Sequence, residues 1–270
     1  MSNSYPQKLH TSADLHQWFQ TPAGQYLLEW EHEKVSEAVV DIFGYHALQL
    51  GVPELQGLLA NRMPHQWFCD DHAHSGSGAI ARPMAFLTDF VALPFPASSL
   101  DLIVLPHTLE LSADPHASLR EVERVLVPEG RVVICGFNPW SLWGLRQRRE
   151  HIYRHFGSET LFLPDFGEFI AYWRLKDWLR LLGFEVELGK FGCYRPAVDS
   201  QRLLQRFEWL DRAGARWWPV FGAAYFLVAV KRVRGMRLMG PAWKQTPALS
   251  AGQVSVASRG AEFHVEESGR

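Results

Sequence analysis

Two apolar runs on either side of one amphipathic segment constrain the fold of this chain more than any other feature. Leu100–Leu105 (LDLIVL) and Arg131–Phe137 (RVVICGF) are almost continuously apolar, as is typical of parallel strands buried on both faces of a sheet. Between them, Asp114 can cap a helix, Pro115 fits its first position, and Pro128–Gly130 can end it. A strand, a helix and a strand in this order form a crossover unit. The sequence therefore predicts an α/β fold with a parallel sheet.

Further elements extend this unit in both directions. A helix is expected to start at Thr21–Pro22, and Tyr45–Gly51 and His65–Cys69 are expected as the first two strands, with another helix beginning at Leu55. Near the end of the domain, a helix over Trp173–Leu182 precedes a final pair of strands, and the span between 140 and 169 has no regular period. The final strands are expected over 184–188 and 225–233.

The composition limits the number of domains. With 270 residues and 47% hydrophobic content, the chain can bury one sizeable core. Beyond Gly235 the sequence becomes rich in Gly, Pro, Ser and Ala and has no apolar period. We therefore predict one domain over residues 1–235 that includes an N-terminal helical extension, and a disordered tail over 236–270.

Charge and cysteine content exclude several classes of protein. The formal net charge of −2 provides no overall attraction to nucleic acid or anionic membrane. Cys69, Cys135 and Cys193 are widely spaced and form no CxxC or Cys/His zinc pattern, so we expect no metal site. The first residues lack the basic start and apolar run of a secretory signal, and no apolar run is long enough to span a bilayer. These observations predict a cytoplasmic protein.

A set of short motifs carries a resemblance to a known family. Asp89 is followed by Leu93-Pro94-Phe95, then by Leu100-Asp101, and then by Leu119–Gly130, which spells L-x-E-x-x-R-V-L-x-P-x-G. This pattern resembles class I S-adenosylmethionine-dependent methyltransferases of the type 11 group. The phrase Gly136–Arg146 (GFNPWSLWGLR) is similar to that of a bacterial subfamily.

The resemblance extends over roughly residues 30 to 233. It implies a Rossmann-like fold with a seven-stranded, mostly parallel sheet, an antiparallel final strand and helices on both faces. It also implies S-adenosylmethionine as the cofactor.

The loop after the first strand departs from the family pattern. The family has an acidic residue followed by three alternating glycines, which allow the backbone to approach the methionine part of the cofactor. Here Gln49 takes the place of the acid and only Gly51 of the glycines is retained, because Pro53 and Leu55 occupy the other two positions. Glu54 either supplies a displaced carboxylate or is a solvated residue at a helix start.

The resemblance assigns other cofactor contacts to the ends of the next strands. Asp70, or its neighbour Asp71, would accept hydrogen bonds from the ribose hydroxyls, and a turn-forming Asp pair is the alternative. Asp89 would accept a hydrogen bond from the adenine amino group and Phe90 would pack on the ring. An Asx turn that leads into Val91 is the alternative for Asp89. Leu105 and Pro106, at the end of the fourth strand, would place backbone along the cofactor.

His107 is the predicted catalytic residue. It follows the fourth strand, where the family has its first substrate-side residues, and a neutral imidazole there can take a proton from a hydroxyl or amine acceptor. A histidine hydrogen-bonded to a loop carbonyl is the alternative. Glu110, one helical turn further on, is a second candidate, with a solvated carboxylate as its alternative.

Aromatic and basic residues gather in the expected substrate region. The aromatic ones suit a planar or apolar acceptor, although core packing explains them as well; they are Trp140, Trp143, Phe156, Phe162, Phe166 and Trp173. The basic ones would meet phosphate or RNA, with a solvated helix face as the alternative; they are Arg146, Arg148, Arg149, His151, Arg154 and His155.

Three functions remain open at this point. The first is methyl transfer from S-adenosylmethionine to a small or aromatic-bearing acceptor, and the second is a degenerate, methyltransferase-like binding or regulatory module. The third, a dinucleotide-dependent dehydrogenase, is disfavoured because the first turn lacks G-x-G-x-x-G. A small-molecule substrate is expected, nucleic acid is disfavoured as a partner, and no pattern indicates an oligomeric state.

Overall fold

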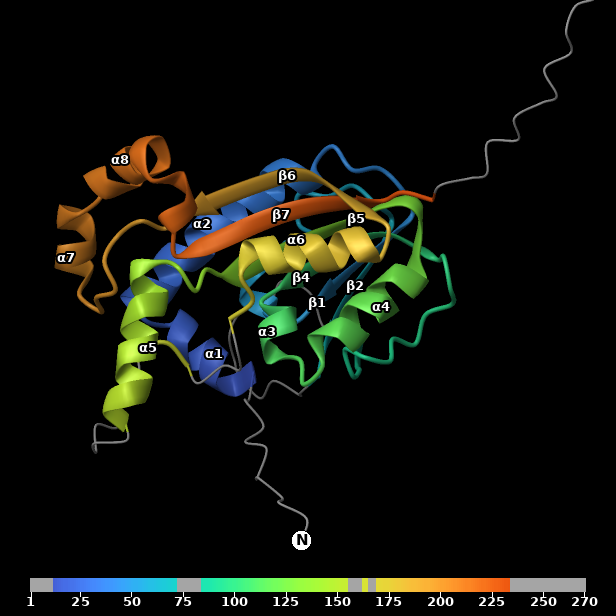
Figure 1. The fold of residues 1–270 in the computed structure, drawn as a ribbon. Coiled ribbons are helices and arrows are strands. Elements are labelled where there is room, and N and C mark those ends of the chain that lie inside the picture. The colour runs from blue at the N-terminus through green and yellow to red at the C-terminus, as the bar shows by residue number, and fades with distance from the viewer. Residues whose placement is uncertain (1–11, 72–83, 155–161, 165–168, 234–270) are drawn as a thin grey trace, which may run out of the picture. The chain divides into compact units, whose positions relative to one another are not determined.

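The computed structural model describes residues 12–71, 84–154, 162–164 and 169–233 (Figure 1). All of these belong to one compact unit, Met1–Val233. The tail predicted over 236–270 lies outside the described residues, so its boundary and its disorder stay predictions.

One seven-stranded sheet forms the centre of the domain, in the order β3-β2-β1-β4-β5-β7-β6. Neighbouring pairs among β1 to β5 are parallel, whereas β7 runs antiparallel to both β5 and β6. The strands are β1 (His46–Leu50), β2 (His65–Asp70), β3 (Phe86–Leu87), β4 (Leu100–Pro106), β5 (Leu126–Phe137), β6 (Phe184–Gly192) and β7 (Ala224–Lys231). The predicted fold class is confirmed.

Burial of the strands agrees with their sequence pattern. β7 is buried along its whole length, and β4 and most of β5 are buried as their continuous apolar runs predict. The free cysteines Cys69, Cys135 and Cys193 are all buried. None of the helices in the described part of the chain is long and apolar enough to cross a membrane.

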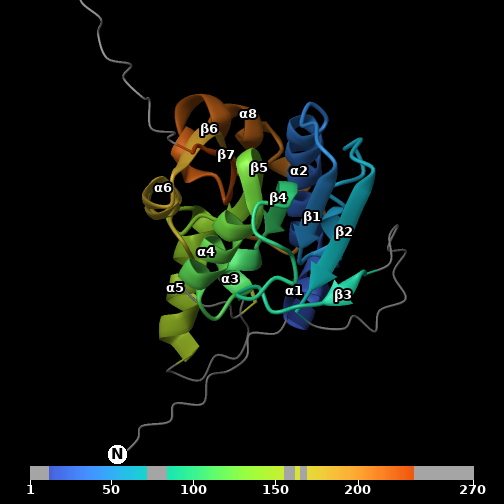
Figure 2. The same ribbon diagram turned by 90° about the vertical axis from the view of Figure 1, so that its right-hand side faces the viewer.

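Two helices start at the predicted caps. In α2 (Pro22–Val39) the Thr21 hydroxyl accepts from the Gly24 amide at 3.1 Å, and in α4 (Pro115–Val125) the Asp114 carboxylate accepts from the Ala117 amide at 2.9 Å. These bonds satisfy amides that a helix start leaves unpaired. Helices cover both faces of the sheet, with α4 and α6 (Tyr172–Leu181) on one face and α2 on the other (Figures 1 and 2).

The remaining helices connect these elements or flank the sheet. They are α1 (Ser12–Phe19), α3 (Thr108–Leu111), α5 (Leu142–Arg154), α7 (Gln201–Arg206) and α8 (Trp209–Trp217), with 3-10 turns η1 (Pro53–Leu55) and η2 (Pro219–Phe221).

Two predictions about local structure are wrong. No helix begins at Leu55, because Gln56 adopts a left-handed backbone (φ +47°) that ends η1 after one turn. The span from 140 to 169 is not irregular throughout, since it contains α5. A missing apolar period concealed this helix, whose outer face is rich in arginine.

The strand order reverses between β1 and β4, with β2 and β3 on one side and β5 on the other. In open α/β sheets, ligands bind beyond the carboxyl ends of the strands at such a switch point. A ligand-binding site is therefore expected among the residues that follow β1, β2, β3 and β4.

Candidate active site

Gly51 lies at the point where the ends of several strands converge. Its backbone adopts φ +76°, which glycine takes without strain, and its amide donates to the Cys69 carbonyl at the end of β2 at 2.8 Å. A Cβ on Gly51 would lie 3.8 Å from both Phe90 Cζ and the Pro106 carbonyl oxygen. The structure thus brings together the predicted residues that follow β1, β2, β3 and β4.

Gln49 supports the loop from within. Its side chain is buried, and its amide nitrogen donates to the carbonyls of Gly51 and Val52 at 3.2 and 2.8 Å. Its Oε1 accepts from the Gly57 amide at 2.8 Å. Because all these partners belong to the loop, Gln49 holds the shape of the turn here and does not offer its side chain to a ligand.

Glu54 is not a solvated residue at a helix start. Its carboxylate interacts with His16 Nδ1, so it links α1 to the loop after β1. This contact places α1 over the carboxyl edge of the sheet.

Asp70 occupies the predicted ribose position at the end of β2. Its side chain is buried, and its Oδ1 accepts from the Asp71 amide at 2.7 Å. Burial, together with the hydrogen bond to the Asp71 side chain, raises the pKa of Asp70 to about 8. Its backbone carbonyl accepts from Thr88 at 2.9 Å, which brings the segment containing Asp89 next to it.

Asp89 forms the Asx turn that the sequence left as an alternative. Its Oδ1 accepts from the Val91 amide at 3.0 Å, and the residue is exposed. Phe90 beside it is buried and points toward Gly51. Leu105 and Pro106 end β4 as buried residues, and the Pro106 carbonyl oxygen lies at the Gly51 turn.

His107 is enclosed by two carboxylates. The residue is fully buried with φ +54°, its Nε2 lies 2.9 Å from Glu31 Oε1, and its Nδ1 lies 2.7 Å from Glu110 Oε2. Although burial lowers the pKa of His107, the charges and hydrogen bonds of Glu31 and Glu110 raise it to about 10. Two carboxylates facing the two ring nitrogens favour the protonated ring over the neutral base that the sequence predicted. The geometry therefore argues against proton transfer to His107.

Glu110 is also not the solvated carboxylate that the sequence left as its alternative. It is buried, and its Oε1 accepts from the Phe137 amide at 2.6 Å, which ties the end of β4 to the end of β5. Burial raises the pKa of Glu110, even though His107 and the Phe137 amide act to lower it.

Glu31 is the residue that sequence reasoning missed. It lies on the buried face of α2 between Leu27 and Val35 and is itself fully buried. Its Oε2 has no hydrogen-bond partner among the residues that the structure describes. A carboxylate inside an otherwise apolar helical stripe was the available signal, since an isolated charge is seldom buried without a partner or a ligand.

Helix α1 covers this cluster with aromatic side chains. Trp18 packs edge-on against Phe137, Trp143 and Phe162, with ring centroids 5.8, 5.9 and 6.4 Å away. The neighbouring Phe19 lies 6.1 Å from the His107 ring. Trp143 and Phe162, predicted for the substrate region, are thus core residues beneath α1, whereas Phe156 and Phe166 lie outside the described residues.

A pocket of about 320 Å³ opens further along the same edge, beyond β5. The pocket is lined by Trp140 and Trp173 of the predicted aromatic set, which are both more than half exposed. Its other aromatic walls are Tyr172, Phe191 and Phe221. Its walls are apolar, which suits a planar or weakly polar ligand.

The predicted basic set does not form a free patch. Arg146 pairs with Glu150 at 2.6 Å and covers the Phe162 ring, and Arg148 lies 5.6 Å from the Trp140 ring centroid. Arg149 is exposed on α5 and also has an interaction partner. The side chains of His151, Arg154 and His155 lie outside the described part. The solvated helix face is the interpretation that the described residues favour.

Comparison with known sequences agrees with this architecture. A family model described as a methyltransferase domain matches residues 73–134. The uncharacterized protein YafS of Escherichia coli (strain K12) is 30% identical over 172 residues, which are 63% of this chain and 65% of YafS. The malonyl-[acyl-carrier protein] O-methyltransferase of Halorhodospira halophila is 37% identical over 67 residues, 25% of this chain and 23% of that enzyme. The chain thus spans less than two thirds of the length of either relative.

A solved structure shows the same fold. An S-adenosylmethionine-dependent methyltransferase from Thermotoga maritima superposes with a TM-score of 0.54 at 15% identity, over 82% of this chain and 95% of that one. Together with the strand order, this likeness shows that the chain has the Rossmann-like fold of class I methyltransferases, and the matched domain segment agrees with that fold.

Proposed function

We propose that this protein transfers a methyl group from S-adenosylmethionine to an apolar or aromatic-bearing acceptor. The observation that carries the proposal is the convergence of Gly51, Asp70 and the Asp89–Phe90 pair at the switch point of the sheet. These residues lie where an open α/β sheet binds its ligand.

The residues at the switch point fit the parts of the cofactor. Asp70 supplies a carboxylate for the ribose diol, and Gly51 has no side chain to obstruct the close approach of a ligand to the backbone. Gln49 replaces the acidic residue that the family has before the glycine loop, and its side chain is already hydrogen-bonded to the backbone of that loop. Glu31 Oε2, a buried acceptor without a partner among the described residues, fits the ammonium group that this acid would hold.

His107 enters the proposal as a positioning residue. Both of its ring nitrogens contact carboxylates, so it holds Glu31 and Glu110 in place beside the loop. The cofactor supplies a methyl group that is already activated by the sulfonium. What this chain must add is orientation and the exclusion of water, which the aromatic cover of α1 provides.

The acceptor is proposed to bind in the pocket that contains Trp140 and Trp173. This pocket lies on the β5 side of the switch point, whereas the cofactor residues lie on the β1 and β2 side. Aromatic walls favour flat, apolar ligands.

Titration calorimetry with S-adenosylmethionine and S-adenosylhomocysteine tests the proposal. We expect both to bind, and we expect Asp89→Asn to weaken binding at least tenfold, the loss of about 1.5 kcal/mol from one hydrogen bond to a ligand. The asparagine keeps an oxygen for the Asx turn, so a loss reports on the ligand rather than on the turn.

Matched variants sharpen the experiment. Glu31→Gln should weaken both ligands, whereas Asp177→Asn, an exposed carboxylate on α6, should not change binding. The absence of heat with either ligand at millimolar concentration would contradict the proposal and favour a module that retains the fold without the activity.

A further inference from the structure

The segment from α7 to η2 exposes large aromatic side chains. Trp209, Trp217, Trp218 and Phe221 are 58, 70, 56 and 51% exposed. Clusters of large apolar residues at the surface of a domain mark interaction sites more often than single exposed ones do. We call the exposed side chains of residues 201–221 the tryptophan–arginine face.

The orientation of α8 determines which of its side chains belong to this face. Asp211 and Gly214 point toward the domain, since Gly214 is buried and Asp211 accepts a hydrogen bond from the Tyr194 amide at 3.1 Å. Residues on the opposite side of the helix therefore point outward. These include Trp209 and Arg216, both of which are exposed.

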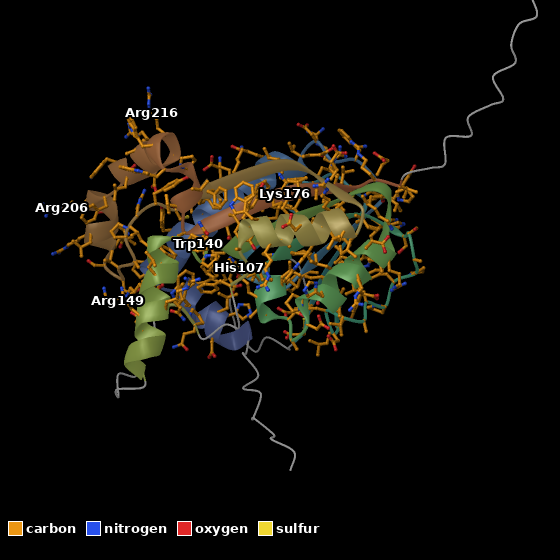
Figure 3. The ribbon with its side chains drawn as sticks, in the orientation of Figure 1. His107, Trp140, Arg149, Lys176, Arg206 and Arg216 are labelled. Carbon is orange, nitrogen blue, oxygen red and sulfur yellow. The ribbon has the colours of Figure 1, made fainter. Side chains whose placement is uncertain are left out.

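Four arginines carry the charge of the face. All four are exposed, and none forms an ion pair with any residue that the structure describes. They are Arg202, Arg206, Arg212 and Arg216. Arg206 and Arg216 project from α7 and α8 away from the sheet (Figure 3).

Few acids oppose these arginines. Within residues 201–221 the acids are Glu208 and Asp211, and Asp211 is engaged by Arg195 at 2.9 Å. The face is therefore cationic, although the chain as a whole has a formal charge of −2. Because charges are screened over about 8 Å at physiological salt, the local charge determines what approaches.

The face continues into the apolar pocket. Val220 and Phe221 of η2 line the pocket. Asn138 fixes this junction, since its side chain donates to the carbonyls of Val220 and Gly222 at 2.8 and 2.9 Å. A partner that bound the tryptophan–arginine face would therefore lie next to the opening of the pocket.

We propose that the tryptophan–arginine face docks onto a lipid bilayer that contains anionic phospholipids. Tryptophan favours the level of the headgroups, where its apolar ring and its N–H are both accommodated, and arginine binds phosphate oxygens in a bidentate manner. A second copy of this chain does not suit the face, because a two-fold interface would set like-charged arginines against one another. This docking does not depend on methyl transfer.

Co-sedimentation of the full chain with vesicles tests the docking. We expect binding to phosphatidylcholine vesicles that contain about 30% phosphatidylglycerol, because an anionic lipid surface attracts basic residues. We expect weak or no binding to pure phosphatidylcholine. Binding to the acidic vesicles should fall as salt is raised from about 50 to 300 mM, because salt screens the arginines.

Paired variants separate the two chemistries of the face. Arg212→Gln/Arg216→Gln should weaken binding to acidic vesicles about thirtyfold, which is the combined effect of two basic residues at such a surface. Trp217→Ser/Trp218→Ser should weaken it at least tenfold without removing charge. The control Arg180→Gln/Leu181→Ser removes an exposed arginine and an 86% exposed leucine from the end of α6 and should bind like the parent.

Each variant is compared with the parent only if its melting temperature equals that of the parent, so that a loss of vesicle binding does not reflect unfolding. No binding to acidic vesicles, equal binding to neutral ones, or equal loss in the control pair would overturn the proposal. The proposal would also be overturned if a single-stranded RNA oligonucleotide bound the protein more tightly than acidic vesicles do and displaced them. That result would assign the face to nucleic acid. Failure here leaves cofactor binding untouched, which the calorimetry measures separately.

Discussion

At the scale of single residues, the buried group formed by Glu31, His107 and Glu110 shows how a fold can hold charge in its core. Each carboxylate contacts one ring nitrogen of His107, and Glu110 also accepts a hydrogen bond from the Phe137 amide. Removing one member of such a group leaves an uncompensated charge, which costs more than the pair itself contributes. The group therefore gives the folded state a characteristic dependence on pH.

The first prediction concerns the effect of pH on stability through His107. Its pKa rises from 6.5 to about 10 on folding, so the stabilisation is fully present below about pH 6.5 and is lost as pH rises through about 10. We expect the free energy of unfolding, measured by urea denaturation, to fall over this window. His107→Gln should lose that slope and cost about 3 kcal/mol near pH 6.5.

A matched control is His116→Gln, because His116 is exposed on α4. This variant should retain the slope of the parent. An unchanged slope in His107→Gln would mean that the histidine is not protonated in the folded state.

The second prediction uses the raised pKa of Asp70. Because burial and Asp71 raise the pKa of Asp70 to about 8, its carboxyl is mostly neutral at lower pH, while a ribose diol prefers the carboxylate as acceptor. We expect the affinity for S-adenosylhomocysteine to increase between about pH 6.5 and 8.5. Calorimetry across this range should show a flat profile for Asp70→Asn, and a parallel rise in the variant would assign the effect to another group.

The third prediction distinguishes positioning from base catalysis at His107. If His107 only positions Glu31, His107→Gln should weaken cofactor binding and turnover together. A loss of about a hundredfold in turnover with cofactor affinity within a few fold of the parent would instead restore the general-base role. The experiment uses whichever acceptor a screen of aromatic compounds identifies.

At the scale of elements, the ends of the helices follow local rules closely. Thr21 and Asp114 cap α2 and α4 with side-chain hydrogen bonds, and a proline follows each cap. The loop after β1 behaves differently, because long-range packing shapes it. A Cβ on Gly57 would approach Val35 Cγ1 of α2 to 3.0 Å, so this loop lies tightly under α2.

The fourth prediction tests the cap of α2. Thr21→Ala should cost about 1 kcal/mol and lower the melting temperature by about 2 to 4 °C, because the Gly24 amide loses its partner. Thr21→Ser keeps the hydroxyl and should melt within about 1 °C of the parent. Calorimetric or circular-dichroism melting curves measure both, and equal losses would show that the methyl group of Thr21, rather than its hydroxyl, is what matters.

At the scale of the whole molecule, the carboxyl edge of the sheet gathers the features that matter for function. The converging loops, the covered charge cluster and the aromatic pocket all lie along it, and the tryptophan–arginine face adjoins the pocket. The amino edge carries fixed turns, such as the one in which Asp101 accepts from the Tyr45 and His46 amides at 2.9 Å.

The fifth prediction concerns the end of the chain. The sequence beyond Gly235 has no apolar period that could bury a surface. Deleting residues 236–270 should therefore leave the melting temperature and the affinity for S-adenosylhomocysteine nearly unchanged. A drop of several degrees would show that this segment packs on the domain.

The sequence by itself determined the architecture. Apolar runs such as Leu100–Leu105, caps such as Asp114 and the crossover between strands are local or short-range features, so β4, α4 and β5 could be read from their own residues. The same local signals placed Gly51, Asp70 and Asp89 at strand ends, where parallel topology alone brings them together.

Only the tertiary structure decided the chemistry of the site. Glu31 and His107 are 76 positions apart, and no pattern in either segment indicates that they meet or that the pKa of the histidine is raised. The protonation state of a buried group depends on which charges surround it, and the exposure of Trp217 depends on what the rest of the chain leaves uncovered. These properties arise from contacts distant in sequence, which local propensity does not encode.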